Sequence, residues 1–446
     1  MFETVLVANR GEIARRVIRT VQRMGLRAVA VHSDVDADLP FVTEADEAVA
    51  IGPAAPAQSY RDATAIIEAA RQTGAKAVHP GYGFLSEDPA FARQVAAAGL
   101  VWVGPPAEAI EAMGDKIRAR NLVAAAGVPV SRGTAEPVPD VESALAAAGG
   151  IGYPLMVKAS AGGGGMGMAV AVDEDALRTE LDRVRAFAER MFGDPAVLLE
   201  RYFPHVRHVE VQVLGLADGT VVALGERDCS VQRRNQKVAE ETPSPAVDAA
   251  LREQLFAAAV RSATAVGYRN AGTVECLLDV DSGSVVFLEM NTRLQVEHPV
   301  TEMVTGIDLV EAQLRVAAGE RVRFDPLAVT SSGHAIELRV NAEDPVRFLP
   351  GPGRITAWEE PTGEGVRVDS GYVAGNTVTP HYDSLMAKLV VHGADRAQAL
   401  ERARAAVAGF RVEGPKCNLA FFAELLENPE FVSGEYDTGV VGRMRG

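Results

Sequence analysis

Residues 273–290 read Thr-Val-Glu-Cys-Leu-Leu-Asp-Val-Asp-Ser-Gly-Ser-Val-Val-Phe-Leu-Glu-Met, and they carry the clearest structural signal in the chain. Two β-branched and apolar runs flank Asp-Ser-Gly-Ser at 281–284, a pattern typical of a β-hairpin. If the turn centres on Ser282, Glu275 and Glu289 each lie seven residues from it. The pattern therefore predicts that these two carboxylates face each other across the hairpin.

Opposed carboxylates on neighbouring strands repel each other, so a cation between them is expected. Mg²⁺ prefers oxygen ligands of this kind, and Asn291, two residues after Glu289 and facing the same way, could supply a third. The alternative is a pair of solvated surface glutamates, which the apolar residues around them disfavour. We therefore predict a metal site formed by Glu275, Glu289 and Asn291.

Four consecutive glycines at 162–165 lie between a predicted strand that ends at Lys158 and another that begins near Ala169. Because they lie between strands and do not open a helix, they do not match the dinucleotide-binding fingerprint. Their backbone amides could close over phosphate oxygens, which the ammonium group of Lys158 could also reach. A plain hairpin loop is the alternative, and the nearby lysine favours a phosphate-binding flap.

The segment that follows the hairpin, Asn-Thr-Arg-Leu-Gln-Val-Glu-His-Pro at 291–299, is densely polar and close to the predicted metal site. Arg293 could bind a small planar anion with its fork of donors, and Gln295 could add a hydrogen bond. Glu297 could accept a proton, whereas His298 before a proline is more typical of a structural role. Two further polar clusters occur at 208–212 and 226–237, of which the second, taken alone, is typical of a charged loop.

The order of predicted elements indicates an α/β N-terminal part and an α+β remainder. A strand at Thr4–Ala8, a helix with Ile13 and Val17 on its apolar face, and a strand at Ala28–Val31 predict a βαβ unit in a parallel sheet. After a Pro- and Gly-rich stretch, short alternating runs predict antiparallel sheet with interspersed helices. The predicted domains are residues 1–114, 115–330 with a glycine-rich lid at about 131–203, and 331–446.

Composition excludes several classes of protein. With 446 residues, 48% hydrophobic and 23% charged, the chain is neither disordered nor membrane-spanning in character, and its formal net charge of −16 disfavours nucleic acid as a partner. The N-terminus lacks the basic start of a secretory signal, so a cytoplasmic location is expected. The three cysteines lack CxxC spacing, which argues against a disulfide framework or a zinc site. Only six of the 44 basic residues are lysines, so each lysine is informative.

Taken together, these segments resemble biotin carboxylase of the ATP-grasp superfamily over essentially the whole chain. The resemblance implies an ATP-grasp fold with an N-terminal Rossmann-like domain and a C-terminal α+β domain. It implies ATP and Mg²⁺ (or Mn²⁺) as cofactors, and bicarbonate and carrier-bound biotin as substrates that react by way of carboxyphosphate. The most specific matching pieces are Ala8–Ala14, His79–Glu87, Met113–Lys116, Glu226–Lys237 and Glu289–Thr301.

The resemblance also implies a role for each matching side chain. The residues implied to contact ATP are Lys116, Lys158, Gly163, Gly164, Gly165, Met168, Glu200, His208, Gln232 and Asn235. Those implied to hold bicarbonate or biotin are Tyr82, Lys237, Arg293, Gln295, Val296, Arg339 and Asp383. Glu297 would deprotonate bicarbonate, with Arg293 and Lys237 beside it, and Arg339 would stabilise the biotin enolate.

The implied partners are a biotin carrier protein, a carboxyltransferase subunit and a second copy of the chain. Because no Met-Lys-Met biotinylation sequence occurs, the carrier is expected to act in trans. Met166 and Asn235 depart from the pattern of acyl-CoA carboxylases and resemble urea-type enzymes. The expected system is an acetyl-CoA or other acyl-CoA carboxylase. A urea-type component, another ATP-grasp ligase and a nucleotide-binding regulatory subunit without turnover are the alternatives.

Overall fold

The computed structural model describes residues 1–160 and 167–446. Gly163, Gly164, Gly165 and Met166, which the sequence places in the flap, therefore lie outside the described residues.

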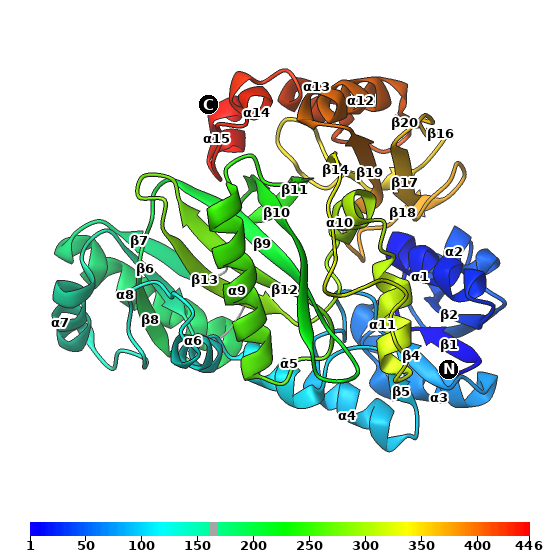
Figure 1. The fold of residues 1–446 in the computed structure, drawn as a ribbon, viewed down its shortest axis with the longest axis horizontal. Coiled ribbons are helices and arrows are strands. Elements are labelled where there is room, and N and C mark those ends of the chain that lie inside the picture. Colours follow the sequence, from blue (N-terminus) through cyan, green and yellow to red (C-terminus); the bar gives the residue numbers. More distant parts are fainter. Residues whose placement is uncertain (161–166) are drawn as a thin grey trace.

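The N-terminal part is a parallel five-stranded sheet in the order β3-β2-β1-β4-β5, with helices on its faces (Figure 1). All four residues of β1 are buried, as expected of a parallel strand covered on both sides. The strands are β1 (Thr4–Val7), β2 (Arg27–Ser33), β3 (Glu47–Gly52), β4 (Ala77–His79) and β5 (Val101–Trp102), and the helices are α1 (Gly11–Arg23), α2 (Pro40–Glu44), α3 (Ala63–Thr73), α4 (Pro89–Ala97) and α5 (Ala107–Gly114). The predicted βαβ unit and parallel sheet are confirmed.

The loops after β1 and β4 are tied together by Asn9. Its side-chain amide donates to the carbonyl oxygens of Pro80 and Tyr82, each at 2.7 Å. Gly81 has a φ of +62°, and a Cβ there would lie 2.8 Å from the Asn9 amide nitrogen, so only glycine fits. These loops lie at the carboxyl ends of parallel strands, where ligands bind in folds of this class.

Because His79 is buried, we predict that the free energy of unfolding decreases as the pH falls. Its Nδ1 accepts from the Gly81 amide at 3.0 Å, and its Nε2 lies 3.1 Å from Gln313 Oε1, so the folded state holds the neutral ring. Burial lowers the pKa of His79 from 6.5 to about 4. Since the unfolded chain binds the proton first, about 3 kcal/mol of stability is lost as the pH falls from roughly 6.5 to 4. Urea unfolding across this range should show a shallower loss for His79→Gln, whereas replacing exposed His381 with glutamine should leave the slope unchanged. Equal slopes for the wild-type protein and His79→Gln would contradict this assignment.

A small three-stranded sheet, β7-β6-β8, projects from the rest of the molecule (Figure 1). It has its own apolar core, which includes Leu155, Val157, Leu177 and Leu181. Lys158 pairs with Met168 across β6 and β7, so the two strands that flank the glycine run are neighbours in the sheet. The elements are α6 (Lys116–Ala125), α7 (Val141–Ile151), β6 (Leu155–Ala159), β7 (Met168–Ala171), α8 (Glu174–Phe192) and β8 (Val197–Arg201). Aspartates cap the first turns of α6, α7 and α8, which explains where these helices begin.

An eight-stranded antiparallel sheet, in the order β13-β12-β9-β10-β11-β14-β19-β17, forms the remaining scaffold. Its strands are β9 (Val206–Gly215), β10 (Val221–Arg233), β11 (Gln236–Thr242), β12 (Asn270–Asp279), β13 (Val285–Asn291), β14 (His334–Asn341), β17 (Val366–Ser370) and β19 (Leu385–Gly393). The helices around it are α9 (Ala249–Ala265), α10 (His298–Thr305), α11 (Leu309–Ala317), α12 (Arg396–Gly409), α13 (Leu419–Leu425), α14 (Pro429–Ser433) and α15 (Val440–Arg445). Short strands β15 (Gly353–Arg354), β16 (Ala357–Glu359), β18 (Thr377–Val378) and β20 (Arg411–Glu413) pair in two small ladders.

The interpretation of 226–237 as a charged loop is wrong. Residues 226–233 continue β10, and 236–242 form β11, so the polar residues lie inside the sheet. The polar side chains are tolerated there because long-range partners satisfy them: Arg252 binds Glu226, and Arg207 binds Asp228. The sheet also runs without interruption from β11 to β14, across the domain boundary expected near 330.

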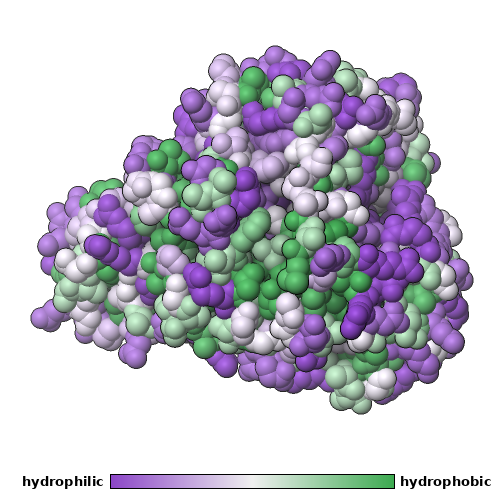
Figure 2. All heavy atoms as spheres, viewed as in Figure 1, coloured by the Kyte–Doolittle hydropathy of each residue, from purple (hydrophilic) through white to green (hydrophobic). Residues whose placement is uncertain are grey.

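Hydrophilic residues cover much of the face in Figure 2, and a hydrophobic area lies near its centre, between α9 and α11. Among the described residues, none of the helices combines the length and the apolarity needed to cross a membrane.

Candidate active site

A large cavity of about 1580 Å³ lies where the N-terminal loops meet the eight-stranded sheet. It brings together residues that are hundreds of positions apart in the chain. The predicted site residues that line it are Tyr82, Lys116, His208, Asn235, Lys237, Glu275, Glu289, Asn291, Arg293, Gln295, Val296, Arg339 and Asp383. Lys158, Met168, Glu200, Gln232 and Glu297 do not line it.

The predicted hairpin is confirmed, because Glu275 of β12 pairs directly with Glu289 of β13. Burial raises the pKa of Glu289 above its usual value, and the neighbouring charge of Glu275 raises it further. The two carboxylates therefore repel each other in a buried place, as the sequence indicated. A divalent cation with a preference for oxygen would relieve this repulsion.

Glu275 is surrounded by donors. Its Oε1 accepts from Lys237 at 2.9 Å, from Asn291 at 2.8 Å and from Gln295 at 3.1 Å. Its Oε2 lies 2.9 Å from His208 Nε2. Burial would lower the pKa of His208, but the charge of Glu275 raises it. Protein cations thus already compensate Glu275, whereas Glu289 makes no such close ion pair among the described residues.

Lys237 lies between three carboxylates. Its ammonium group is 2.5 Å from Glu210, 2.9 Å from Glu275 and 2.7 Å from Glu297. Burial disfavours its charge, but the acidic groups around it, Cys229 among them, raise the pKa of Lys237 well above the usual value. It therefore remains a cation that holds the acidic cluster together.

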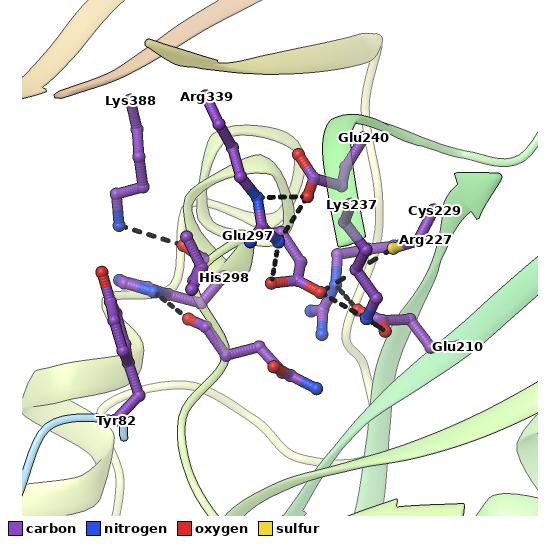
Figure 3. A network of polar contacts seen from close by, with 12 residues as sticks. Tyr82, Glu210, Arg227, Cys229, Lys237, Glu240, Glu297, His298, Arg339 and Lys388 are labelled. Carbon is purple, nitrogen blue, oxygen red and sulfur yellow. Dashed lines mark hydrogen bonds and ion pairs between the residues drawn. The ribbon is translucent and has the colours of Figure 1, made fainter. Parts of the chain in front are cut away.

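Glu297 is fully buried between two cations, as Figure 3 shows. One carboxylate oxygen contacts Lys237 and the other accepts from Arg339 at 3.0 Å. Burial would raise its pKa, but Lys237, Arg339 and Arg227 together lower the pKa of Glu297 well below its usual range. The group is therefore ionised at neutral pH and able to accept a proton.

Arg339 is oriented by a second carboxylate. Its Nε donates to Glu240 at 2.6 Å, while the same guanidinium group contacts Glu297 (Figure 3). Burial raises the pKa of Glu240 to about 7, although Arg339 opposes the shift. Arg339 therefore lies at the edge of the cavity with two of its donors fixed.

Arg293 is also held in place. It donates to Glu87 at 2.9 Å through Nε and to Gln295 at 2.7 Å through Nη1. Its other terminal nitrogen donates to the Asn291 side-chain oxygen at 3.1 Å. The predicted third metal oxygen is thus engaged with Arg293 in this structure.

The predicted nucleotide residues come from several elements. Lys158 pairs with Glu200 at 2.5 Å across β6 and β8, and Gln232 lies 2.7 Å from His208 Nδ1. Burial lowers the pKa of Lys116, and the neighbouring charge of Lys158 lowers it further, although Glu289 opposes this. A phosphate group between the two lysines would relieve their repulsion. Arg234 and Asn235, at φ of 51° and 64°, form the tight turn between β10 and β11 beside the cavity.

Sequence reasoning missed Arg227, a fully buried guanidinium group in β10. It donates to Glu210 at 2.6 Å and to Gln212 at 2.8 Å, and it also reaches the hydroxyl groups of Thr273 and Thr301. The available signal was the alternation of His208, Glu210 and Gln212 with valines. In a strand buried on both faces, such alternation places the polar side chains on one face of the sheet. Buried polar groups need hydrogen-bond partners, so a buried donor such as Arg227 was to be expected beside them.

Lys388 of β19 was also missed, although it is one of the few lysines. It is fully buried, donates to the Val296 carbonyl oxygen at 3.0 Å and lies 3.0 Å from Glu12 of α1. Glu12 in turn accepts from the Tyr82 hydroxyl. Lys388 therefore joins the N-terminal part, the 291–299 segment and the C-terminal strands. Figure 3 shows its contact with the 291–299 segment.

Replacing Lys388 with methionine is expected to lower the free energy of unfolding by about 3–5 kcal/mol, because Glu12 is left as a buried, uncompensated charge. The double variant Lys388→Met with Glu12→Gln should recover part of this loss. Urea unfolding of the three proteins measures the coupling. Additive losses in the double variant would show that the two groups do not depend on each other.

Family models match nearly the whole chain. Residues 1–110 match the biotin carboxylase N-terminal domain, 115–324 the ATP-binding domain of the carbamoyl-phosphate synthase L chain, and 337–443 the biotin carboxylase C-terminal domain.

Curated relatives agree with these matches. The chain is 48% identical to biotin carboxylase of Pseudomonas aeruginosa, with 97% of this chain and 96% of that protein covered. It is 47% identical to one of the subunits of pyruvate carboxylase from Methanothermobacter thermautotrophicus, over 100% of this chain and 90% of that protein. It is 48% identical to the human mitochondrial propionyl-CoA carboxylase alpha chain, over 98% of this chain and 60% of that protein.

Solved structures give the same result. A complex of Campylobacter jejuni biotin carboxylase with a β,γ-ATP ligand has a TM-score of 0.96 and 41% identity, and 99% of each chain is covered. The biotin carboxylase domain dimer of Hydrogenobacter thermophilus 2-oxoglutarate carboxylase, with MgADP, ADP and bicarbonate, has a TM-score of 0.94 and 42% identity, over 99% of this chain and 98% of that one. The expected ATP-grasp architecture is confirmed, and the chain is an enzyme that belongs to the biotin carboxylase family.

Proposed function

We propose that this enzyme carboxylates biotin on a separate carrier protein, using MgATP and bicarbonate, as the first half-reaction of a biotin-dependent carboxylase. One observation carries the proposal. The buried carboxylate of Glu297 lies between Lys237 and Arg339, beside the opposed pair of Glu275 and Glu289. An acid pair for a metal and cations for an anion thus line one cavity, and the carboxylate for the proton lies directly behind these cations.

The residues present fit the metal. Glu275 and Glu289 offer carboxylate oxygens from paired strands, and burial together with the charge of Glu275 raises the pKa of Glu289, although Lys116 and His208 oppose the shift. We assign Mg²⁺ (or Mn²⁺) to these two residues, with Asn291 assisting. When bound, the ion neutralises charge on the ATP phosphates.

The phosphate groups of ATP are assigned to Lys116, Lys158 and His208, with Glu200 and Gln232 nearer the adenosine. Met168 and the glycines at 163–165 belong to the proposed flap. Closing such a flap excludes water, which would otherwise hydrolyse carboxyphosphate. Asn235 lies in the turn beside the cavity, where it can approach the nucleotide.

Bicarbonate is assigned to Arg293, Lys237, Gln295 and the Val296 backbone, with Glu297 as its base. Lys237, which lowers the pKa of Glu297, is also proposed to face the anion. Binding of bicarbonate offsets the charge of Lys237, so it should raise the pKa of Glu297 and make it a stronger base. Glu297 would therefore become a stronger base only while bicarbonate is bound, and it would then prepare bicarbonate to attack the γ-phosphate.

Biotin is assigned to the side of the cavity formed by Tyr82, Arg339 and Asp383. Once carboxyphosphate has formed, its breakdown gives CO₂ and phosphate, and phosphate takes the proton from the ureido nitrogen. Arg339, fixed by Glu240, would stabilise negative charge on the ureido oxygen, as an oxyanion hole does.

The test is phosphate release measured with and without bicarbonate and biotin. The proposal requires that release depend on both substrates. Release that depends on bicarbonate but ignores biotin would indicate another ATP-grasp ligase, and nucleotide binding without turnover would indicate a regulatory subunit.

The proposal extends to the rest of the carboxylase system. We infer an acyl-CoA as the final acceptor, a carboxyltransferase subunit as partner, a homodimer and a cytoplasmic location. The division into residues 1–114, 115–330 and 331–446 is part of the same proposal. Relatives named for pyruvate, propionyl-CoA and 2-oxoglutarate carboxylases show why the acceptor needs its own assay, in which urea is the alternative substrate.

A further inference from the structure

A second cavity, of about 570 Å³, adjoins the active-site cavity. It is formed by the turn after β10, the loop at 346–349 and helix α15, which contacts β10 (Figure 1). Arg233, Arg234, Phe348 and Leu349 line both cavities. We call the second cavity the α15 groove. A molecule seated in it would lie next to the mouth of the active site.

The wall of the α15 groove carries positive charge that acidic groups do not pair. Within the described residues, Arg234 and Arg347 make no ion pair or side-chain hydrogen bond. Arg233 donates to the backbone carbonyl oxygens of Arg347 and Phe348, at 2.6 and 3.2 Å. Burial lowers the pKa of Arg233, and the nearby charge of Arg234 lowers it further, although Glu343 opposes this.

The arginines of α15 differ from these three. Arg443 pairs with Glu430 and Asp437, and Arg445 pairs with Glu424. In a chain with a net charge of −16, most of the long-range field repels acidic partners. The three unpaired guanidinium groups therefore mark a local surface where an anionic partner is favoured.

Apolar side chains stand beside the charges. Val346 is 60% exposed and Leu349 is 51% exposed, at the two ends of the 346–349 loop that helps to form the groove. The Arg233 guanidinium group lies 4.8 Å from the centre of the buried Phe348 ring, and this cation–π contact holds the planar cation in place. Exposed aliphatic groups with ordered arginines are typical of surfaces that bind proteins.

We propose that the α15 groove docks an acidic, partly apolar segment of the biotin carrier, so that the carrier's biotin enters the adjoining cavity. The inference rests on the proposed function, since it assigns where the carrier of that reaction binds. Carboxylates of the segment would pair with Arg234 and Arg347, and an apolar side chain would cover Val346 and Leu349. The groove thus orients the carrier without taking part in the chemistry.

The test uses three substrates: free biotin and two peptides of equal length that contain biotinyl-lysine, one flanked by glutamates and the other by lysines. The wild-type enzyme should carboxylate the glutamate peptide with a KM about three- to tenfold lower than the lysine peptide at low salt. The difference should shrink near 1 M salt, where the screening length falls to about 3 Å.

Arg347→Glu, alone and with Val346→Ser, should abolish or reverse the preference for the glutamate peptide. Both residues line only the α15 groove, so the KM for free biotin should not change. Free biotin therefore also reports whether the variants are folded. Arg261→Glu makes the same charge change at an exposed position of α9 that lines neither cavity, and it should keep the preference.

An unchanged preference in Arg347→Glu, with free-biotin turnover intact, would overturn the docking proposal alone. A loss of preference equal in Arg261→Glu and Arg347→Glu would do the same, because it would show only a long-range charge effect. Absence of turnover in the wild-type enzyme with free biotin and with both peptides would instead overturn the proposed function, and the docking proposal with it.

Discussion

Replacing Glu297 with glutamine is expected to lower bicarbonate-dependent phosphate release by about 10²- to 10⁴-fold, the usual contribution of a positioned general base. Glutamine keeps the size of the side chain, but its single carbonyl oxygen can accept from Lys237 or from Arg339 and not from both, because the two cations bind different oxygens of Glu297. It removes the negative charge and the capacity to take a proton. The rate should therefore fall much more than nucleotide affinity, which fluorescence titration with ATP measures.

The control is Glu241→Gln, at a glutamate that is equally buried in β11. Glu241 binds His334, Arg396 and Tyr436 and does not line the active-site cavity. This variant should lose stability but keep most of its phosphate release. If Glu297→Gln retained wild-type release, the base assignment would be wrong.

Replacing Lys237 with methionine is expected to have the second large effect, on both activity and stability. Three buried carboxylates, Glu210, Glu275 and Glu297, lose the cation they share. Removing one partner of a buried ion pair typically costs about 3–5 kcal/mol. Phosphate release should also fall by at least about 100-fold, because an anion-binding group and the alignment of Glu297 are lost together.

The pH dependence of Lys237→Met separates this explanation from simple misfolding. Without the ammonium group, the carboxylates should have raised pKa values in the folded state. These carboxylates then bind more protons in the folded state than in the unfolded state, so the stability of the variant relative to the wild-type protein should increase as the pH falls from about 7.5 to 5.5. Urea unfolding at the two pH values measures this, and a further Glu210→Gln change should restore stability at pH 7.5 without restoring activity. A stability loss, relative to the wild-type protein, that is the same at both pH values would show that Lys237 does not compensate these charges.

Local patterns were sufficient to predict part of the site. The register of Glu275 with Glu289 follows from the position of one turn, because side chains alternate along each strand from that point. The parallel N-terminal sheet follows in the same way from short periodic runs. These features depend on residues close together in the sequence, so the sequence alone was enough.

The polar interior of the large sheet could not be predicted in this way. Glu226, Arg227 and Asp228 look like surface residues, yet each is buried and satisfied by a partner at least 16 positions away. The assumption that polar residues are exposed is wrong wherever buried ion pairs take the place of contacts with water. Lys388 and Glu12 meet only after three parts of the chain have folded together, so no local pattern could pair them.

The pairing of β11 with β14 has a consequence for how the enzyme works. Lys237 and Arg339 stand on these two bonded strands, next to the bonded pair of Ala239 and Leu338. The group proposed to hold bicarbonate and the group proposed for biotin chemistry are therefore positioned by one continuous sheet. The separation between the two reaction centres is built into backbone hydrogen bonds. Carboxyphosphate or CO₂ formed beside Lys237 would therefore travel a constant distance to Arg339, whether or not the β7-β6-β8 sheet moves.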